Sequence, residues 1–198
     1  LIPDTVFAAA MVELSFRVWG PGKVAVPVNL PLVFEKIASR YGGEVIRTRV
    51  DLGHLMEVAE KEQVNIAADG TGSIILPRFH PAPDALFALA TLLEFLALQK
   101  TKLSEVVDSI PVYHLEHREV PCPWESKGQV MRLLNEQYKD TPHDNIDGIR
   151  IWLGEGTWVL VHPDPDRPSF HVYSEANSRA EAISLAERYA RIIEGFRE

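Results

Sequence analysis

The first candidate for chemistry is a histidine-rich segment in the second half of the chain. His114 and His117 precede Cys122, the only cysteine of the sequence, and imidazole and thiolate groups are ligands that zinc prefers. The segment alternates like a strand, however, so side chains three positions apart face opposite sides. Neither a second cysteine nor a nearby histidine pair completes a tetrahedral set. We therefore predict no metal site in this segment.

Two other groups have simpler explanations than catalysis. His80 lies between Phe79 and Pro81 and could act as a general base, but no paired nucleophile is visible, so we interpret it as a loop-packing residue. Trp152 and Trp158 flank a predicted hairpin turn. A cross-strand pair is more typical of these positions than a stacking platform for a sugar.

Four aspartates could be taken for a calcium loop: Asp144, Asp147, Asp164 and Asp166. Their spacing lacks the twelve-residue pattern that ends in a glutamate. We therefore interpret them as solvated loop acids.

Bulk composition excludes several classes of function. The chain has 198 residues and a formal net charge of -8, which disfavours general binding to nucleic acid or to an anionic membrane. No apolar run is long enough to span a bilayer, and no basic segment precedes Val6 as in a signal peptide. A single cysteine excludes an internal disulfide and is typical of a reducing compartment, so we expect a cytoplasmic protein. Because the first residue is leucine, we also expect the chain to be part of a longer one.

Strands and helices alternate over Leu1–Ser109, which predicts an α/β three-layer domain, a mixed sheet with helices. The predicted elements are a helix capped by Asp4 and running to about Val18, a strand over Val24–Asn29, a helix from Pro31 to Gly42–Gly43, a strand over Glu44–Val50, a helix over Leu52–Glu62, strands over Val64–Ala68 and Ser73–Leu76 around the turn Asp69–Gly72, and a helix from Pro83 through Leu98.

The pattern changes after Pro111, and Pro111–Glu198 predicts a small α+β domain with an antiparallel sheet. Its predicted elements are an extended segment over Val112–Val120, an amphipathic helix over Glu125–Tyr138, a polar loop over Lys139–Ile146, a hairpin of Ile149–Leu153 and Thr157–Val161, a strand over Ser169–Ala176, and a final helix from Ser178.

Four stretches in order resemble the α-D-phosphohexomutase superfamily of phosphomannomutases and phosphoglucomutases. Leu1–Val12 is similar to the segment after that family's metal-binding loop, and Tyr41–Thr48 to its second strand–helix unit. Gly72–Leu86 resembles the strand and helix after its sugar-recognition loop. Gly148–Val161, with the residues that follow, resembles the hairpin and phosphate loop of its last domain. A fifth stretch, Val120–Trp124, is similar to mutase-like regions fused behind sugar nucleotidyltransferases.

The resemblance implies that the chain is the third and fourth domains of a four-domain parent. In this family the first domain carries a phosphoserine and the second an aspartate-rich magnesium loop, and both would precede Leu1. It implies no catalytic residue and no cofactor in the chain itself, whereas a full-length active relative would need Mg²⁺. The expected partners are the upstream domains of the same polypeptide and a hexose phosphate, with a homo-oligomer as a further option.

The family's sugar loop, Gly-Glu-x-Ser-Gly, is matched here by Ala68-Asp69-Gly70-Thr71-Gly72-Ser73. Asp69 and Thr71 keep the acid and the hydroxyl that hold a pair of sugar hydroxyls, but the acid is one methylene shorter. Ser73 stands where the family often has histidine. The resemblance implies a sugar site at these three residues, while a plain turn explains the same residues because Asp-Gly and Thr-Gly pairs form turns readily.

The family's phosphate loop, Arg-Pro-Ser-Gly-Thr-Glu-Pro, is matched here by His162-Pro163-Asp164-Pro165-Asp166-Arg167-Pro168. His162 replaces the arginine, and Asp164 and Asp166 replace the two hydroxyl residues. Carboxylates repel a phosphate dianion, and the single cation of Arg167 does not compensate for two of them. Gly53 occupies the place of a basic residue that the family often has. We predict that the phosphate site is degenerate and that any hexose phosphate binds weakly.

Two functions remain open. The chain is either the recognition half of a phosphomannomutase- or phosphoglucomutase-like protein, inactive alone, or a non-catalytic regulatory or oligomerisation module. The second would be fused to a sugar nucleotidyltransferase such as a mannose-1-phosphate guanylyltransferase.

Overall fold

The computed structural model describes residues 1–197 and divides into two compact units, with the division between Val112 and Tyr113. Each unit has its own five-stranded sheet, and the two are described separately. No helix among the described residues is both long and apolar enough to cross a bilayer.

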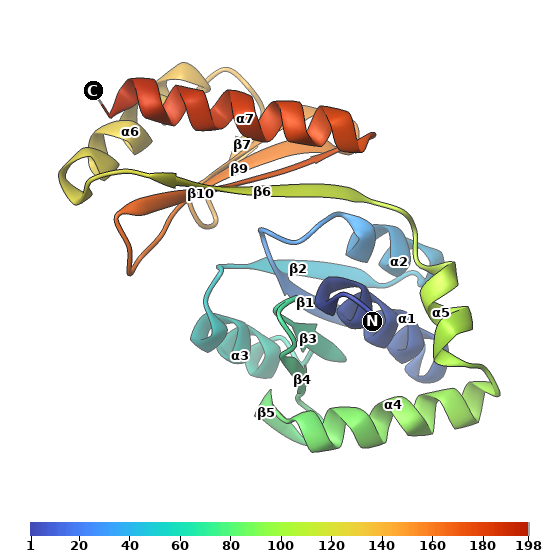
Figure 1. Ribbon diagram of the computed structural model, residues 1–198. Helices are drawn as coiled ribbons and strands as arrows, with labels where there is room; N and C mark the ends of the chain where they lie inside the picture. The colour runs from blue at the N-terminus through green and yellow to red at the C-terminus, as the bar shows by residue number, and fades with distance from the viewer. Residues whose placement is uncertain (198) are drawn as a thin grey trace. The chain divides into compact units, whose positions relative to one another are not determined.

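The first unit is built on a mixed sheet in the order β2-β1-β3-β4-β5 (Figure 1). β1 pairs in parallel with β2 and with β3, whereas β4 pairs antiparallel with both β3 and β5. The strands are β1 (Lys23–Pro27), β2 (Glu44–Thr48), β3 (Ile66–Ala68), β4 (Ile74–Leu76) and β5 (His80–Pro83), and the helices are α1 (Asp4–Trp19), α2 (Val33–Tyr41), α3 (Leu52–Lys61), α4 (Ala85–Gln99) and α5 (Leu103–Ser109). The expected mixed sheet with helices is therefore confirmed.

Helix α1 forms the interior of this unit. Every residue from Ala8 to Phe16 is buried, because the helix packs against α2, α4 and α5. Glu13 is only 1% exposed, and its carboxylate accepts hydrogen bonds from Arg17 at 2.7 Å and from the Tyr41 hydroxyl at 2.6 Å. The predicted cap at Asp4 is wrong. Pro3 occupies the N-cap position without a side-chain bond, and Asp4 is the first helical residue, where its charge interacts with the helix dipole.

Two short strands were missed because their sequences lack strand character. His80 was expected in a loop but lies in β5, an edge strand that contains two prolines, which an edge tolerates. The polar segment Lys139–Ile146 was expected to be a loop throughout, but it contains β7 (His143–Asp144), which pairs with β8 (Ile149–Gly154).

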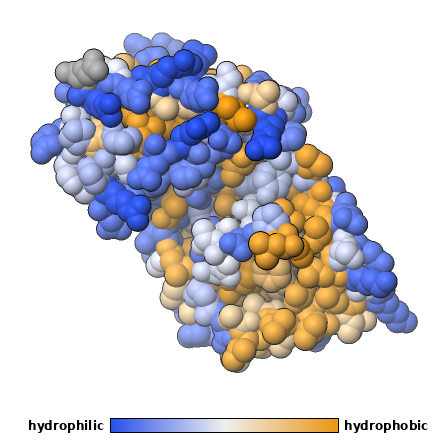
Figure 2. Space-filling view, in the orientation of Figure 1, coloured by the Kyte–Doolittle hydropathy of each residue, from blue (hydrophilic) through white to orange (hydrophobic). Residues whose placement is uncertain are grey.

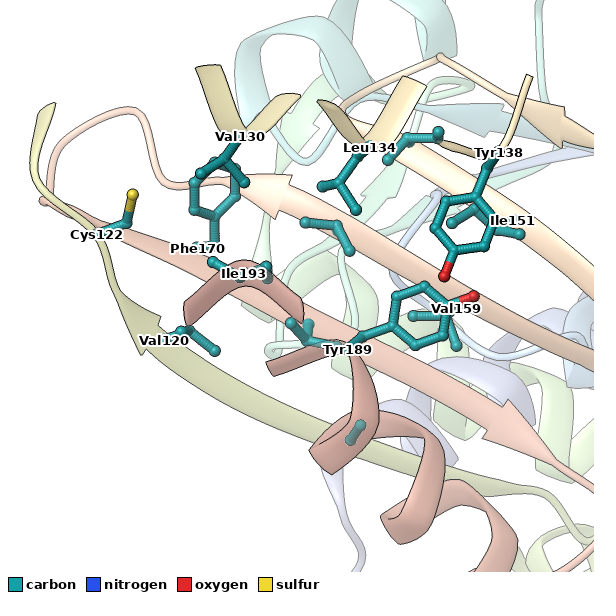
Figure 3. Packing of buried hydrophobic residues seen from close by; sticks show 14 residues of the cluster. Val120, Cys122, Val130, Leu134, Tyr138, Ile151, Val159, Phe170, Tyr189 and Ile193 are labelled. Atoms are coloured by element: carbon teal, nitrogen blue, oxygen red, sulfur yellow. The ribbon is translucent and has the colours of Figure 1, made fainter. Parts of the chain in front are cut away.

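The second unit is an antiparallel sheet in the order β6-β10-β9-β8-β7 with two helices on one face. The remaining elements are β6 (His114–Pro121), β9 (Thr157–Pro163), β10 (Ser169–Ala176), α6 (Trp124–Gln137) and α7 (Arg179–Phe196). Figure 3 shows the apolar core between helices and sheet, in which Val130 of α6 and Ile193 of α7 lie near Phe170. Farther along the sheet, Tyr189 of α7 stacks on Tyr138 with ring centres 5.5 Å apart. Trp152 and Trp158 are register partners, as expected. This antiparallel α+β unit confirms the second half of the predicted fold class.

Strand alternation leaves a second face of this sheet, opposite α6 and α7, which we call the distal face. His117 of β6, Trp158, Leu160 and His162 of β9, and His171, Tyr173 and Glu175 of β10 lie on it, because their sequence neighbours belong to the core.

We propose that the two units are independent domains joined at Ile110–Tyr113, and limited proteolysis checks this. Val112 is 78% exposed and follows the end of α5, so a non-specific protease is expected to cut near it first, or in the 139–142 segment before β7. Two fragments that each unfold cooperatively are the expected products. A first cut within α4, between Leu86 and Leu98, would contradict this boundary.

Candidate functional site

The candidate sugar site lies at the carboxyl edge of the parallel strands in the first unit. From β1 the chain goes to β2 on one side, and from β2 it goes to β3 on the other, so the loops after β1 and β3 meet where the strand order reverses. Ligands of open α/β sheets bind in the crevice at such a switch point. The two loops pack closely, because Gly70, at φ +76°, lies so near to Leu30 that a Cβ would overlap its side chain.

The loop after β1 is held by a residue that sequence analysis missed. Arg47 donates to the carbonyl oxygens of Pro27, Leu30 and Pro31 at 3.0, 2.8 and 2.9 Å. Its guanidinium also forms a bidentate pair with Glu35 at 2.7 and 2.6 Å. From the sequence, Arg47 was only one residue of a predicted strand. Because β2 pairs with β1, its guanidinium reaches the loop that follows β1.

The structure brings Asp69, Thr71 and Ser73 together, as expected for a sugar site, but they bind one another. One carboxylate oxygen of Asp69 accepts from the backbone N–H of Thr71 at 2.8 Å and of Ser73 at 3.0 Å. The other accepts from the Thr71 hydroxyl at 2.7 Å. Burial alone would raise the pKa of the Asp69 carboxyl, but hydrogen bonds from Ser73 and Thr71 outweigh it, so the pKa lies below its ordinary value. The loop is a closed turn with an ionised acid at its centre.

The start of α3 has no basic side chain where the family often has one. Asp51 caps this helix by accepting from the N–H of His54 at 2.6 Å, and Gly53 between them is exposed. The nearest cation in sequence is Arg49, which is exposed after β2 and was not singled out beforehand.

The loop His162–Pro168 of the second unit is organised around one carboxylate. Asp164 Oδ1 accepts from the backbone N–H groups of Asp166 at 2.8 Å and Arg167 at 3.0 Å, and its Oδ2 lies 2.9 Å from His171 Nε2. The donation from Asp166, followed by those from His171 and Arg167, lowers the pKa of Asp164 to about 2. Two N–H groups and an imidazole therefore hold an anion that belongs to the chain itself.

Because that pKa is lowered on folding, the carboxylate contributes stability that is complete above the unfolded value of 3.8. The contribution is lost as the pH falls from there towards 2.

The other expected residues of this loop do not converge on a ligand position. His162 is 5% exposed, and its Nε2 lies 3.0 Å from the Asp147 carboxylate. The side chains of Asp166 and Arg167 are exposed. Of the four candidate residues, the structure thus places His162 inside the unit and Asp164 at the centre of the loop.

Sequence analysis missed Lys127 of α6, which holds the backbone of the His162–Pro168 loop. Its ammonium donates to the carbonyl oxygen of Asp164 at 2.5 Å and to that of Arg167, and it lies 3.8 Å from the Trp124 ring centre. The available signal was its spacing. Lys127 precedes Val130 by three positions and Leu134 by seven, so it lies on the apolar side of α6.

A chain of hydrogen bonds runs from Asp164 across the distal face. His171 Nδ1 lies 2.9 Å from His117 Nε2, and the His117 ring stacks on Tyr173 at 4.5 Å. Because ionised Asp164 can only accept, His171 carries a proton on Nε2. When neutral it therefore accepts at Nδ1 from His117. Burial, followed by the repulsion of His171, lowers the pKa of His117.

The low pKa of His117 is open to a direct check. An NMR titration is expected to give a midpoint below the ordinary 6.5, and replacing His171→Gln is expected to raise it by removing the second charge. The neutral form is favoured by folding, so this group's stability contribution is present above pH 6.5 and decreases as the pH falls below it. His114→Gln, on the other face of β6, is the matched control and should leave the midpoint unchanged. A midpoint at or above 6.5 would contradict the geometry.

No site for a divalent metal is present among residues 1–197. No group of three or more His, Cys, Asp or Glu side chains in this part of the chain could hold an ion. Cys122 lies in the apolar core of the second unit, whereas His117 is on the distal face. The described residues therefore do not fit Mg²⁺.

Comparison with known proteins gives a consistent result. The family model described as phosphoglucomutase/phosphomannomutase, alpha/beta/alpha domain III matches residues 3–113. A Methanopyrus kandleri protein named "Probable phosphoglucosamine mutase" is 35% identical over 178 residues, covering 88% of this chain and 39% of its own length. A Pyrococcus abyssi protein of the same name is 28% identical over 181 residues, covering 89% of this chain and 40% of its own length. The chain thus spans about two fifths of these relatives.

Solved structures agree at the level of fold. A phosphoglucomutase/phosphomannomutase family protein of Burkholderia thailandensis superposes with a TM-score of 0.78 at 16% identity, over 98% of this chain and 42% of that one. The Aspergillus fumigatus N-acetylphosphoglucosamine mutase, in complex with GlcNAc-6P and magnesium, superposes with a TM-score of 0.66 at 14% identity, over 96% of this chain and 46% of that one.

Proposed function

Because the chain belongs to the phosphoglucomutase/phosphomannomutase family, we propose that it is the carboxy-terminal recognition half of a cytoplasmic phosphohexomutase-like protein of sugar-phosphate metabolism. Its ligand class is a hexose phosphate, and the names of the two relatives favour an amino sugar. The Asp69–Ser73 loop corresponds to the family's sugar loop and the His162–Pro168 loop to its phosphate loop.

We also propose that the phosphate loop of this recognition half is degenerate, and the observation that carries this is the position of the Asp164 carboxylate. The backbone N–H groups of Asp166 and Arg167, which could cradle a phosphate, already donate to it. A phosphate dianion placed there would meet a carboxylate ionised at any pH well above 2. Two unit charges 4 Å apart interact by roughly 4 kcal/mol at the effective dielectric of a protein surface. Phosphate affinity at this loop is therefore weak or absent.

The sugar loop lies at the switch point of the sheet, where ligands of open α/β sheets bind. Its carboxylate, Asp69, is engaged by the loop's own donors: the backbone N–H groups of Thr71 and Ser73, the Thr71 hydroxyl and the Ser73 side chain. A sugar hydroxyl therefore has to compete with these donors for Asp69, so we expect sugar recognition at this loop to be weak.

A coupled mutase assay tests the proposal. We expect no turnover of glucosamine, glucose or mannose phosphates by this chain above the blank, with Mg²⁺ and a hexose 1,6-bisphosphate present, because the described residues provide no metal site to neutralise the transferred phosphoryl group. The intact Methanopyrus kandleri relative is the positive control. Turnover by the chain alone would contradict its assignment as a recognition half.

A second function, a regulatory or oligomerisation module fused to a sugar nucleotidyltransferase, is favoured by one observation. Both recognition loops satisfy their central carboxylates internally, at Asp69 and Asp164, as a module without a ligand would. The coding sequence before Leu1 distinguishes the two functions. A phosphoserine loop and an aspartate-rich loop favour the mutase, and a glycine-rich nucleotidyltransferase loop favours the module.

A further inference from the structure

A cavity of about 400 Å³ opens at the amino edge of the parallel strands in the first unit, opposite the candidate sugar site. Its polar lining consists of Glu60 of α3, Gln63 and Asn65 from the segment between α3 and β3, and Arg78 from the turn between β4 and β5. It is separate from the broad hydrophobic surface that Figure 2 shows over the region of the first unit where Figure 1 places α4, because its lining comes from other elements. Its volume is that of a small-molecule site.

The two charged residues of the cavity are opposite in sign and unpaired. Glu60 lies in the last turn of α3, where the negative end of the helix dipole adds to its charge. Arg78 brings a guanidinium from a different element. Among residues 1–197 neither side chain forms an ion pair, although the next carboxylate, Glu62, pairs with Lys23 at 2.9 Å. One part of the cavity therefore favours a cation and another favours an anion.

An aromatic ring holds Arg78 in position. The Cζ atom of Arg78 lies 4.3 Å from the centre of the Trp19 ring, and Trp19 packs edge-on against Phe95 with ring centres 4.8 Å apart. A guanidinium that stacks on a ring uses its face, so the N–H groups in its plane remain available. That planar fork matches the two oxygens of a carboxylate. Arg78 is thus prearranged to bind a carboxylate group.

Backbone strain coincides with the cavity at Gln63. This residue follows the C-cap of α3 with φ +50°, a left-handed conformation for which glycine is the usual residue. A side chain costs stability there, so the chain keeps an amide at the cavity where a glycine would be more stable. Nearby, Asn65 has a buried Nδ2 atom without a hydrogen-bond partner among the described residues. The two amides add hydrogen-bonding groups for a ligand.

The rest of the lining is apolar and consists of Val64, Pro77 and Pro81. A dianion such as a phosphate would be repelled by Glu60, and a neutral molecule would leave both charges without a partner. We propose that the cavity binds a small zwitterion with an apolar side chain, either a free amino acid or a dipeptide. Its carboxylate pairs with Arg78, its ammonium pairs with Glu60 at the end of α3, and its side chain packs on the apolar lining. The site lies at the opposite edge of the sheet from the candidate sugar site, so it does not depend on the proposed function.

Titration of the ¹H–¹⁵N NMR spectrum of the full chain with L-leucine and with glycyl-L-leucine tests the proposal. For ligands of about ten non-hydrogen atoms we expect a dissociation constant of about 1 mM or below. The shifted signals should belong to residues 60–65 and 77–81. The tighter binder of the two identifies the ligand as a free amino acid or as a dipeptide. A spectrum that stays unchanged in these segments well above the expected constant overturns the proposal.

Two modified ligands test the requirement for both charges. N-acetyl-L-leucine lacks the ammonium and L-leucinamide lacks the carboxylate, so each should bind about 10-fold more weakly than L-leucine, or worse. If both bind as tightly as L-leucine, the ligand class is wrong and the proposal is overturned.

Glu60→Gln and Arg78→Gln should each weaken L-leucine binding about 10-fold or more, because each removes one charge-assisted hydrogen bond. Both residues are exposed, so the fold should tolerate either change. Glu57→Gln is the matched control, because Glu57 is exposed on α3 one turn before Glu60 and does not line the cavity. Binding that neither Glu60→Gln nor Arg78→Gln weakens overturns the proposal.

Gln63→Gly separates binding from stability. Glycine relieves the left-handed conformation, so this variant should unfold at a higher urea concentration than the wild type. It should also bind L-leucine more weakly, because one amide of the cavity is lost. An unchanged affinity in this more stable variant overturns the assignment of Gln63 to the site.

Discussion

Replacing Asp164→Ser is expected to give the chain a phosphate affinity that it lacks. The substitution removes the carboxylate that accepts from the N–H groups of Asp166 and Arg167, and it frees His171 Nε2 as a third donor. A hydrogen bond to a charged group contributes about 1.5–3 kcal/mol. At the lower end of this range, two recovered bonds correspond to an increase in affinity of roughly 100-fold. Calorimetry with glucosamine 6-phosphate and with inorganic phosphate measures it.

Asp166→Ser is the matched control for this prediction. It removes the same charge from the same loop, but the Asp166 carboxylate is exposed, and the two backbone N–H groups donate to Asp164 instead. Its effect should be limited to weaker long-range repulsion, which salt screens. Equal gains from both variants would show that net charge, rather than occupation of the N–H groups, decides affinity. Micromolar binding by the unaltered loop would contradict the degenerate site altogether.

Replacing Gly148→Ala is expected to destabilise the second unit by about 3 kcal/mol or more. Gly148 adopts φ +80°, which costs a residue with a Cβ about 1–2 kcal/mol. The added Cβ would also overlap the carbonyl oxygen of Val161 and lie 3.0 Å from the Cα of His162. Both are backbone atoms of a central strand, so relief requires β8 and β9 to separate, at a further cost of about 1–3 kcal/mol. Urea unfolding followed by tryptophan fluorescence measures the loss.

Gly156→Ala isolates the steric part of that effect. Gly156 adopts a similar φ of +70° in the same hairpin, but its Cβ would meet only the Asn177 side-chain oxygen at 3.5 Å. The control should therefore lose only about 1–2 kcal/mol, from the backbone conformation. If both variants lose the same stability, the backbone at Val161 and His162 can move away from the added Cβ at little cost, which would contradict the steric part of the prediction.

Local sequence determined the elements of both units, because their signals act over a few residues. The Gly42–Gly43 pair ends α2 through a left-handed residue at Gly42, and Asp84 caps α4 by accepting from the N–H of Phe87. The hairpin register that pairs Trp152 with Trp158 also follows from a short turn. The exceptions are Asp4, which lies inside the first turn, and the strands at His80 and His143, whose pairing depends on neighbours distant in sequence.

The resemblance of the motifs predicted two recognition loops, at Asp69–Ser73 and His162–Pro168, and their role in binding stays a prediction. It did not reveal what the loop side chains bind. Asp69 and Asp164 were expected to present or repel a ligand, and in the structure each closes its own loop.

Only the tertiary structure decided the surroundings of those loops. Arg47, Lys127 and His171 come from other strands or helices, and each reaches its partner because the sheet or the helix packing brings it there. The exposure of Leu86, Leu89 and Leu93 on α4 is likewise a property of packing. The helix is apolar on both sides, and its contacts with α1 and β4 determine which side is buried. Hydrogen bonds and apolar contacts act over a few ångströms in space, so they depend on distances that the order of residues does not contain.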